Sequence, residues 1–168
     1  ITDGEAARAL LPDVVSALAK MANKLSISTI YERQQRRNGH GGGLLYGEPP
    51  QLPASERGRH PYELVFREHG MRLLVDVENG QKTGMFLDQR ENRRLVREIS
   101  SGLSVWNGFS YTGGFSLAAA LGGATRVVSV DRAEAAIDTA RRNFELAGLP
   151  LDRHKFLAED AFAALLRS

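Results

Sequence analysis

Residues 105–131 read VWNGFSYTGGFSLAAALGGATRVVSVD, and this stretch decides the fold. An apolar run from Val105, a turn containing Gly113 and Gly114, a helix-forming run and a β-branched run ending at Asp131 predict strand, turn, helix and strand. In an open α/β sheet these parts form half of a nucleotide-cofactor site. The glycines let a cofactor approach the backbone, and the acid at the second strand tip accepts hydrogen bonds from ribose hydroxyls.

The glycine spacing narrows the choice of cofactor. Four residues separate Gly108 from the Gly113–Gly114 pair, so the G-x-G-x-x-G fingerprint of dinucleotide sites is absent. No Lys-Ser or Lys-Thr follows the glycines, which excludes a Walker loop. A cofactor with a ribose but no phosphate needs only one tight turn and the downstream acid, and S-adenosylmethionine fits. An α/β hydrolase or reductase fragment remains open at this point.

Longer strings around the turn point to a family. Asn79–Arg90 reads NGQKTGMFLDQR, and Asn107–Phe115 reads NGFSYTGGF. Together they resemble the bacterial ribosomal RNA methyltransferases that methylate carbon 5 of a cytosine in large-subunit RNA. The resemblance covers about residues 25–168. Three shorter strings follow the same order: Tyr31-Glu32-Arg33, Glu68-His69-Gly70-Met71 and Val128-Ser129-Val130-Asp131.

The resemblance implies an α/β fold, a Rossmann-like class I methyltransferase parallel sheet that is incomplete in this chain and preceded by a small α+β module. Gly108 departs from the family, which more often has Cys or Leu there, and leaves a smaller side chain under the turn. By the same resemblance, a fourth strand with an Asp-Pro-Pro element, a catalytic cysteine and an amino-terminal PUA domain lie outside the chain. No catalytic residue is therefore expected between residues 1 and 168.

Three polar residues at predicted strand ends are candidates for cofactor contacts. Asp131 is expected to bind the ribose, with a cap for a helix starting at Ala133 as the alternative. Asp160 is placed to meet the adenine amino group, with helix capping as its alternative and Glu159 as the substitute. The carbonyl oxygen of Asn107 could accept a hydrogen bond from the methionine ammonium.

The other candidates come from the glycine turn and from the string before it. Turn residues would offer backbone and hydroxyl groups, although Tyr111 could simply pack. The resemblance places part of the preceding string over the cofactor as a lid, where Phe86 could stack on adenine or fill the core. The predicted cofactor-binding residues are Thr83, Phe86, Leu87, Asp88, Asn107, Phe109, Ser110, Tyr111, Thr112, Gly113, Asp131 and Asp160.

Composition sets outer limits. Hydrophobic content of 42% and charged content of 25% are typical of a soluble globular protein. No apolar run reaches the roughly 18 residues of a membrane span, and the start lacks a secretory signal. The absence of cysteine excludes disulfides, thiolate metal sites and cysteine nucleophiles in this segment. The four histidines lack ligand spacing, so no metal site is expected. A cytoplasmic location is the expectation, and a homodimer is left open.

Ribosomal RNA is the expected partner, although the net charge of +2 is weak support. Clustered arginines bind phosphate backbones, but the neighbouring acids also allow a solvated face. A second arginine group runs from Arg90 to Arg97. The predicted RNA-binding residues are Arg33, Arg36 and Arg37, which lie near His40.

Two domains are predicted, residues 1–78 as a small α+β module with RNA contact and residues 79–168 as the amino-terminal half of the cofactor domain. The first should hold a helix over 5–21 that Pro12 delays to about Leu11, a strand over 25–31, a loop over 34–60, and a hairpin of strands 62–67 and 71–77. The second should hold a helix over 87–99 with a stripe of Leu87, Leu95 and Ile99, a helix over 133–146, a strand over 155–157 and a helix from 160. Right-handed β-α crossovers would make its sheet parallel.

The leading interpretation is a methyltransferase that acts on a flipped-out cytosine of ribosomal RNA. The resemblance implies a cysteine, outside this chain, that adds to carbon 6 and makes carbon 5 nucleophilic. A guanine-N methyltransferase would share the cofactor half. A non-catalytic RNA-binding module with a vestigial fold is a third reading, and a nicotinamide oxidoreductase is disfavoured by the absent fingerprint.

Overall fold

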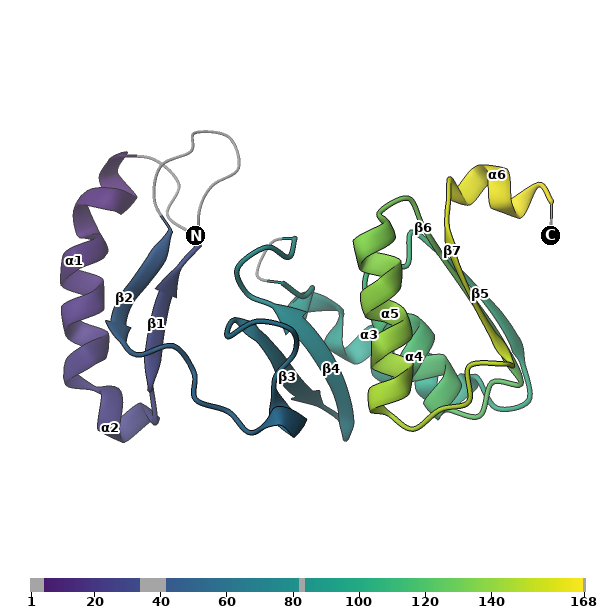
Figure 1. The fold of residues 1–168 in the computed structure, drawn as a ribbon, viewed down its shortest axis with the longest axis horizontal. Helices are drawn as coiled ribbons and strands as arrows, with labels where there is room; N and C mark the ends of the chain where they lie inside the picture. Colours follow the sequence, from purple (N-terminus) through teal and green to yellow (C-terminus); the bar gives the residue numbers. More distant parts are fainter. Residues whose placement is uncertain (1–4, 34–41, 82–83, 168) are drawn as a thin grey trace. The chain divides into compact units, whose positions relative to one another are not determined.

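The computed structural model describes residues 5–33, 42–81 and 84–167 (Figure 1). By their contacts the residues form two compact units, Ile1–Leu64 with Asp76–Gly84, and Val65–Val75 with Met85–Ser168. This division differs from the boundary expected near residue 78, because the segment 65–75 groups with the second unit. Strands β3 (Glu63–Glu68) and β4 (Met71–Asp76) each have residues in both units.

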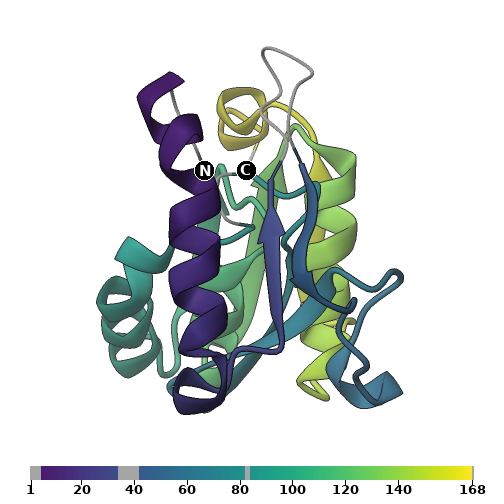
Figure 2. The same ribbon diagram turned by 90° about the vertical axis from the view of Figure 1, so that its left-hand side faces the viewer.

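In the first unit, helix α1 (Glu5–Lys20) lies along a two-stranded sheet (Figure 1, Figure 2). The late helix start expected from Pro12 is wrong, since the helix runs through this residue. Proline removes one backbone donor, and the loss is tolerated within four turns of otherwise good helix formers. A short helix, α2 (Ala22–Leu25), follows and ends at Ser26 in a left-handed conformation with φ 54°. The strand predicted over 25–31 therefore begins later than expected.

That sheet consists of β1 (Thr29–Glu32) and β2 (Gly43–Gly47), paired antiparallel with Ile30 opposite Tyr46. The prediction of a loop over 34–60 is wrong where β2 forms. Its apolar run Leu44–Tyr46 is too short to show alternation, and the flanking glycines are typical of turns. A 3-10 helix, η1 (Ala54–Glu56), lies further along.

The expected hairpin is confirmed. Strands β3 and β4 form a two-stranded sheet joined by His69 and Gly70, both with positive φ (46° and 78°). Positive φ at both central residues is the geometry of a type I′ turn, whose twist matches that of the paired strands. The hairpin is therefore specified locally, by alternation in the strands and by glycine in the turn.

The second unit contains a three-stranded parallel sheet of β5 (Ser104–Gly108), β6 (Arg126–Asp131) and β7 (His154–Ala158), in that order. Its helices follow 3-10 helix η2 (Leu87–Gln89) and are α3 (Arg90–Ile99), α4 (Gly114–Leu121), α5 (Glu134–Leu146) and α6 (Ala161–Leu165). This parallel β-α arrangement is the α/β sheet that the sequence predicts for residues 79–168. Within the described residues, no helix combines the length and hydropathy needed to cross a membrane.

The core of this unit lies between the sheet and helices α4 and α5. Leu117 of α4 and Val127 of β6 are fully buried, as is Phe144 of α5. The Phe144 ring packs edge-on to Phe156 of β7, with centroids 5.0 Å apart, and beside the ring of His154 at 4.9 Å. Burial lowers the pKa of His154, because desolvation disfavours the charged form of the imidazole.

The prediction that an apolar stripe on α3 faces the core is wrong. Leu95 and Ile99 are 53% and 62% exposed, and Leu87 before the helix is 54% exposed. The buried residue of α3 is Arg93, only 3% exposed. Its guanidinium is neutralised by Glu68 of β3, with both nitrogen–oxygen distances 2.7 Å. Sequence periodicity identifies an inward face by its apolar residues, and here a buried ion pair takes that place.

Candidate cofactor site

The turn between β5 and α4 has an unusual backbone. Phe109, Tyr111 and Gly113 have φ of 57°, 50° and 75°, which is the left-handed region. For the two aromatic residues this conformation costs about 1–3 kcal/mol each, and such residues cluster at functional sites. The turn is held by the Ser110 N–H, which donates to the Val130 carbonyl at 2.9 Å. The sheet edge therefore imposes a defined shape on this turn.

Gly113 is required by helix packing as well as by its φ. A Cβ atom on this residue would lie 2.7 Å from the Cβ of Ala140 and 3.2 Å from its Cα. Ala140 is fully buried on α5. The close approach that needs glycine here is thus between the turn and a helix of the same unit.

Asp131 joins the turn to the start of α5. Its Oδ2 accepts from the Tyr111 N–H at 2.8 Å, and its Oδ1 accepts from the Ala133 N–H at 3.0 Å. The second contact is the cap-like role that the sequence left open. A carboxylate has about four acceptor positions, so each oxygen retains capacity for a ribose hydroxyl.

Asn107 is the penultimate residue of β5, and its side chain joins two buried serine hydroxyls. Its Nδ2 donates to Ser116 Oγ at 2.8 Å, and Ser129 Oγ donates to the same oxygen at 2.7 Å. Both serines are buried, at 0% and 1% exposed. Because the amide nitrogen is engaged, the carbonyl oxygen is the atom of Asn107 suited to an ammonium group.

Asp160 caps α6. Its Oδ1 accepts from the N–H groups of Phe162 and Ala163, both at 3.1 Å. Capping is the alternative that the sequence left open for this residue, and its contact with adenine stays a prediction. Glu159, the substitute, forms an ion pair with Arg167.

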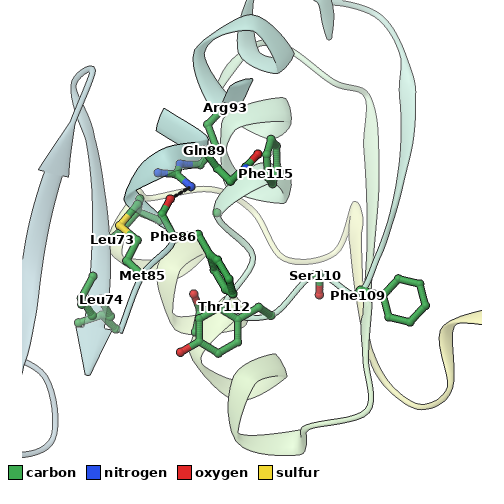
Figure 3. Close-up of a pocket in the computed structure, with 13 residues that line it drawn as sticks. Leu73, Leu74, Met85, Phe86, Gln89, Arg93, Phe109, Ser110, Thr112 and Phe115 are labelled. Carbon is green, nitrogen blue, oxygen red and sulfur yellow. Dashed lines mark hydrogen bonds between the residues drawn. The ribbon is translucent and has the colours of Figure 1, made fainter. Parts of the chain in front are cut away.

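A pocket opens beside the turn (Figure 3). The Phe86 and Tyr111 rings meet edge-on there, with centroids 5.7 Å apart. Ser110 Oγ is buried and has no hydrogen-bond partner among the described residues. A buried hydroxyl without a partner costs free energy, so it marks a place where a ligand group can bond. The lining residues are Leu73, Leu74, Val75, Met85, Phe86, Gln89, Arg93, Phe109, Ser110, Tyr111, Thr112, Gly114 and Phe115.

The pocket brings together five predicted residues, namely Phe86, Phe109, Ser110, Tyr111 and Thr112. Six others lie outside its lining: Leu87, Asp88, Asn107, Gly113, Asp131 and Asp160. Thr83, Arg36 and Arg37 are outside the described residues. The sequence reading missed the β4 wall and Arg93, although the string Glu68-His69-Gly70-Met71 pointed to the hairpin.

The departure at Gly108 also has a structural explanation. A Cβ atom at this position would lie 2.4 Å from two ring atoms of Trp106. The indole thus occupies the space that a larger residue 108 would fill.

Residues 51–167 match the family model of S-adenosylmethionine-dependent methyltransferases. The chain belongs to this family, whose cofactor is S-adenosylmethionine. The prediction of the cofactor is confirmed, and the hydrolase and nicotinamide-dependent alternatives are excluded.

Curated relatives are more specific. Ribosomal RNA large subunit methyltransferase I of Aeromonas salmonicida is 44% identical over 123 residues, which is 73% of this chain and 28% of the relative. The protein of the same name from Serratia proteamaculans is 49% identical over 105 residues, 62% of this chain and 26% of the relative. The chain thus spans little more than a quarter of the length of these relatives.

Solved structures agree on the fold. A protein from Streptococcus mutans described as an S-adenosylmethionine-dependent methyltransferase has a TM-score of 0.74 and 29% identity, covering 94% of this chain and 39% of that one. A methyltransferase structure with the same score and identity contains S-adenosylhomocysteine. Trm5b from Pyrococcus abyssi, at 19% identity and a TM-score of 0.68 over 96% of this chain and 44% of its own, shares the fold.

Proposed function

We propose that the chain forms the cofactor-binding half of a methyltransferase that modifies large-subunit ribosomal RNA. The observation that carries the proposal is the strained turn, which places the unpaired Ser110 hydroxyl in a pocket and the Asp131 carboxylate next to it in the hydrogen-bond network. The two named relatives, at 44% and 49% identity, support ribosomal RNA as the substrate.

The residues would hold S-adenosylmethionine by complementary chemistry. Asp131 would accept from the ribose hydroxyls, and the Asn107 carbonyl oxygen from the methionine ammonium. Ser110 Oγ would bond a polar group of the ligand inside the pocket. Further proposed contacts come from Thr83, Phe86, Leu87, Asp88, Phe109, Tyr111, Thr112, Gly113 and Asp160.

When bound, this cofactor supplies an electrophilic methyl group. The chain's own residues would orient it, and the apolar lining of Leu73, Val75 and Phe115 would exclude water. We propose carbon 5 of a cytosine as the acceptor, with the base flipped out of its stack. A guanine-N methyltransferase and a non-catalytic RNA-binding module are the competing functions. A cytoplasmic location follows from the proposed substrate.

Asp131→Ala is expected to weaken binding of S-adenosylhomocysteine roughly 30–150-fold, because two ligand hydroxyls lose their acceptor at about 2–3 kcal/mol. Calorimetry measures the affinity. Asp131→Asn is the matched variant, since its oxygen can still accept from the Tyr111 N–H while the second acceptor is lost. An Asp131→Ala protein that stays folded and binds as tightly as the parent would sink the assignment.

RNA binding has a separate test. Replacing Arg33, Arg36 and Arg37 by Gln should weaken binding of RNA of any sequence and lower the slope of log affinity against log salt by about two units. Arg33 already donates to the Gly80 carbonyl, and Arg36 and Arg37 lie outside the described residues. An unchanged slope would mean that these arginines form only a solvated face. Affinity for S-adenosylhomocysteine is the internal control and should not move.

A further inference from the structure

The string Glu68-His69-Gly70-Met71 has no part in the cofactor contacts described so far. In the structure it forms the end of the β3–β4 hairpin that groups with the second unit. Glu68 is 3% exposed and Met71 is 1% exposed. A carboxylate so completely buried needs a compensating partner, because desolvation of a charge is costly.

That partner is Arg93, which also reaches the pocket. Its Nε and Nη2 donate to the two carboxylate oxygens of Glu68, each at 2.7 Å. Its Nη1 donates to the carbonyl of Phe86 at 3.0 Å, a contact drawn in Figure 3. Its guanidinium carbon lies 6.0 Å from the centre of the Phe115 ring. One buried side chain therefore fixes the hairpin, the Phe86 segment and the start of α4.

A second buried side chain connects the same hairpin to the turn. Asn143 of α5 is fully buried, and its Oδ1 accepts from the Leu74 N–H at 2.7 Å. Its Nδ2 donates to the carbonyl of Thr112 at 2.8 Å. Leu74 and Thr112 both line the pocket, one from β4 and one from the glycine turn. The amide thus spans two walls of the pocket.

We propose that Glu68, Arg93 and Asn143 are positioning residues, which set the separation of the pocket walls for the cofactor. An apolar core would avoid the desolvation cost of the ion pair, so stability alone does not explain it. The polar groups add a defined geometry. A bidentate guanidinium, and an amide bonded through both its oxygen and its nitrogen, each hold the segments that they join in one relative orientation. This inference rests on the proposed cofactor site.

Arg97 offers a matched control. It lies on the same helix, and its Nη1 donates to the His69 carbonyl of the same hairpin at 3.0 Å. It does not line the pocket. If the two arginines only stabilise the fold, their replacement should have the same effect on cofactor affinity. If Arg93 positions the pocket walls, only its replacement should lower that affinity.

The test compares Arg93→Lys, Asn143→Asp and Arg97→Lys in the full chain. Lysine at position 93 keeps the positive charge but cannot form the bidentate pair with a carboxylate. Aspartate at position 143 keeps the acceptor for the Leu74 N–H but loses the donor to the Thr112 carbonyl. For S-adenosylhomocysteine we expect affinity to fall about tenfold in the first two and less than about twofold in Arg97→Lys. Unfolding curves recorded beside the calorimetry restrict the comparison to folded protein.

Amide resonances give a readout that stability does not move. The Gly113 amide, which shares a peptide bond with the Thr112 carbonyl, should shift in Asn143→Asp. The Leu87 amide, which shares one with the Phe86 carbonyl, should shift in Arg93→Lys, and neither should shift in Arg97→Lys. A parent chain that binds S-adenosylhomocysteine while Arg93→Lys and Asn143→Asp bind it equally well would overturn the positioning role alone. A parent chain that does not bind it would overturn the proposed function, and this inference with it.

Discussion

Glu68→Ala is expected to lower the free energy of unfolding by about 3–5 kcal/mol, since it leaves a buried guanidinium without its carboxylate. The Arg93 side chain is 4% exposed and the Glu68 side chain 1%, so water cannot replace the lost partner. The remaining contact of Arg93 with the Phe86 carbonyl compensates only part of its charge. Urea denaturation measures the change.

A matched control exists on the same helix. Glu98→Ala removes the ion pair with Arg94, whose nitrogen and oxygen are 2.6 Å apart but whose side chains are 48% and 54% exposed. Exposed pairs of this spacing contribute about 0.3–0.5 kcal/mol. Similar losses in the two variants would mean that Glu68 is solvated in solution and that the buried pair is not formed.

Gly113→Val is expected to abolish detectable binding of S-adenosylhomocysteine and to destabilise the fold. The residue has φ 75°, and its new side chain would start 2.7 Å from the Ala140 Cβ. Left-handed geometry costs a branched residue about 1–2 kcal/mol, and the clash adds about 1–3 kcal/mol. Calorimetry and urea denaturation measure the two effects.

The variant Gly148→Val separates the energetic cost of the left-handed backbone conformation from the cost of the steric clash. Gly148 has φ 68°, and a Cβ atom there would meet nothing within 4 Å. It should therefore show the strain cost alone and bind S-adenosylhomocysteine as the parent does. If both variants lose equal stability and Gly113→Val still binds, the turn is not the cofactor loop.

Local signals explain what the sequence could predict. The stretch from Val105 to Asp131 forms β5, α4 and β6 as expected, because alternation, glycine and helix propensity act over a few residues. The hairpin at His69 follows for the same reason. The late helix start predicted from Pro12 is wrong because proline weakens a helix without always ending it, and the packing of α1 maintains the helix through this residue.

Long-range contacts explain what it could not. Arg93 and Glu68 are 25 residues apart, and Leu74 and Asn143 are 69 apart. Neither pair has a periodic signature, so the sequence predicts the hairpin as part of the first module and Leu95 as an inward-facing residue. Position along the chain predicts Asp131 and Asp160 as site residues, but it gives no information on the backbone N–H groups from which their oxygens already accept hydrogen bonds.

The indole of Trp106, which fills the space above Gly108, has an optical consequence. It is the chain's single tryptophan, and it packs against the cluster of Val130, Ala161 and Ala164. Its emission wavelength therefore reports the polarity at the contact between α6, which follows Asp160, and the sheet. Dissociation of that short helix from the sheet would expose the ring to water and shift its fluorescence to the red. Intrinsic fluorescence can therefore follow the packing of α6 without an added probe.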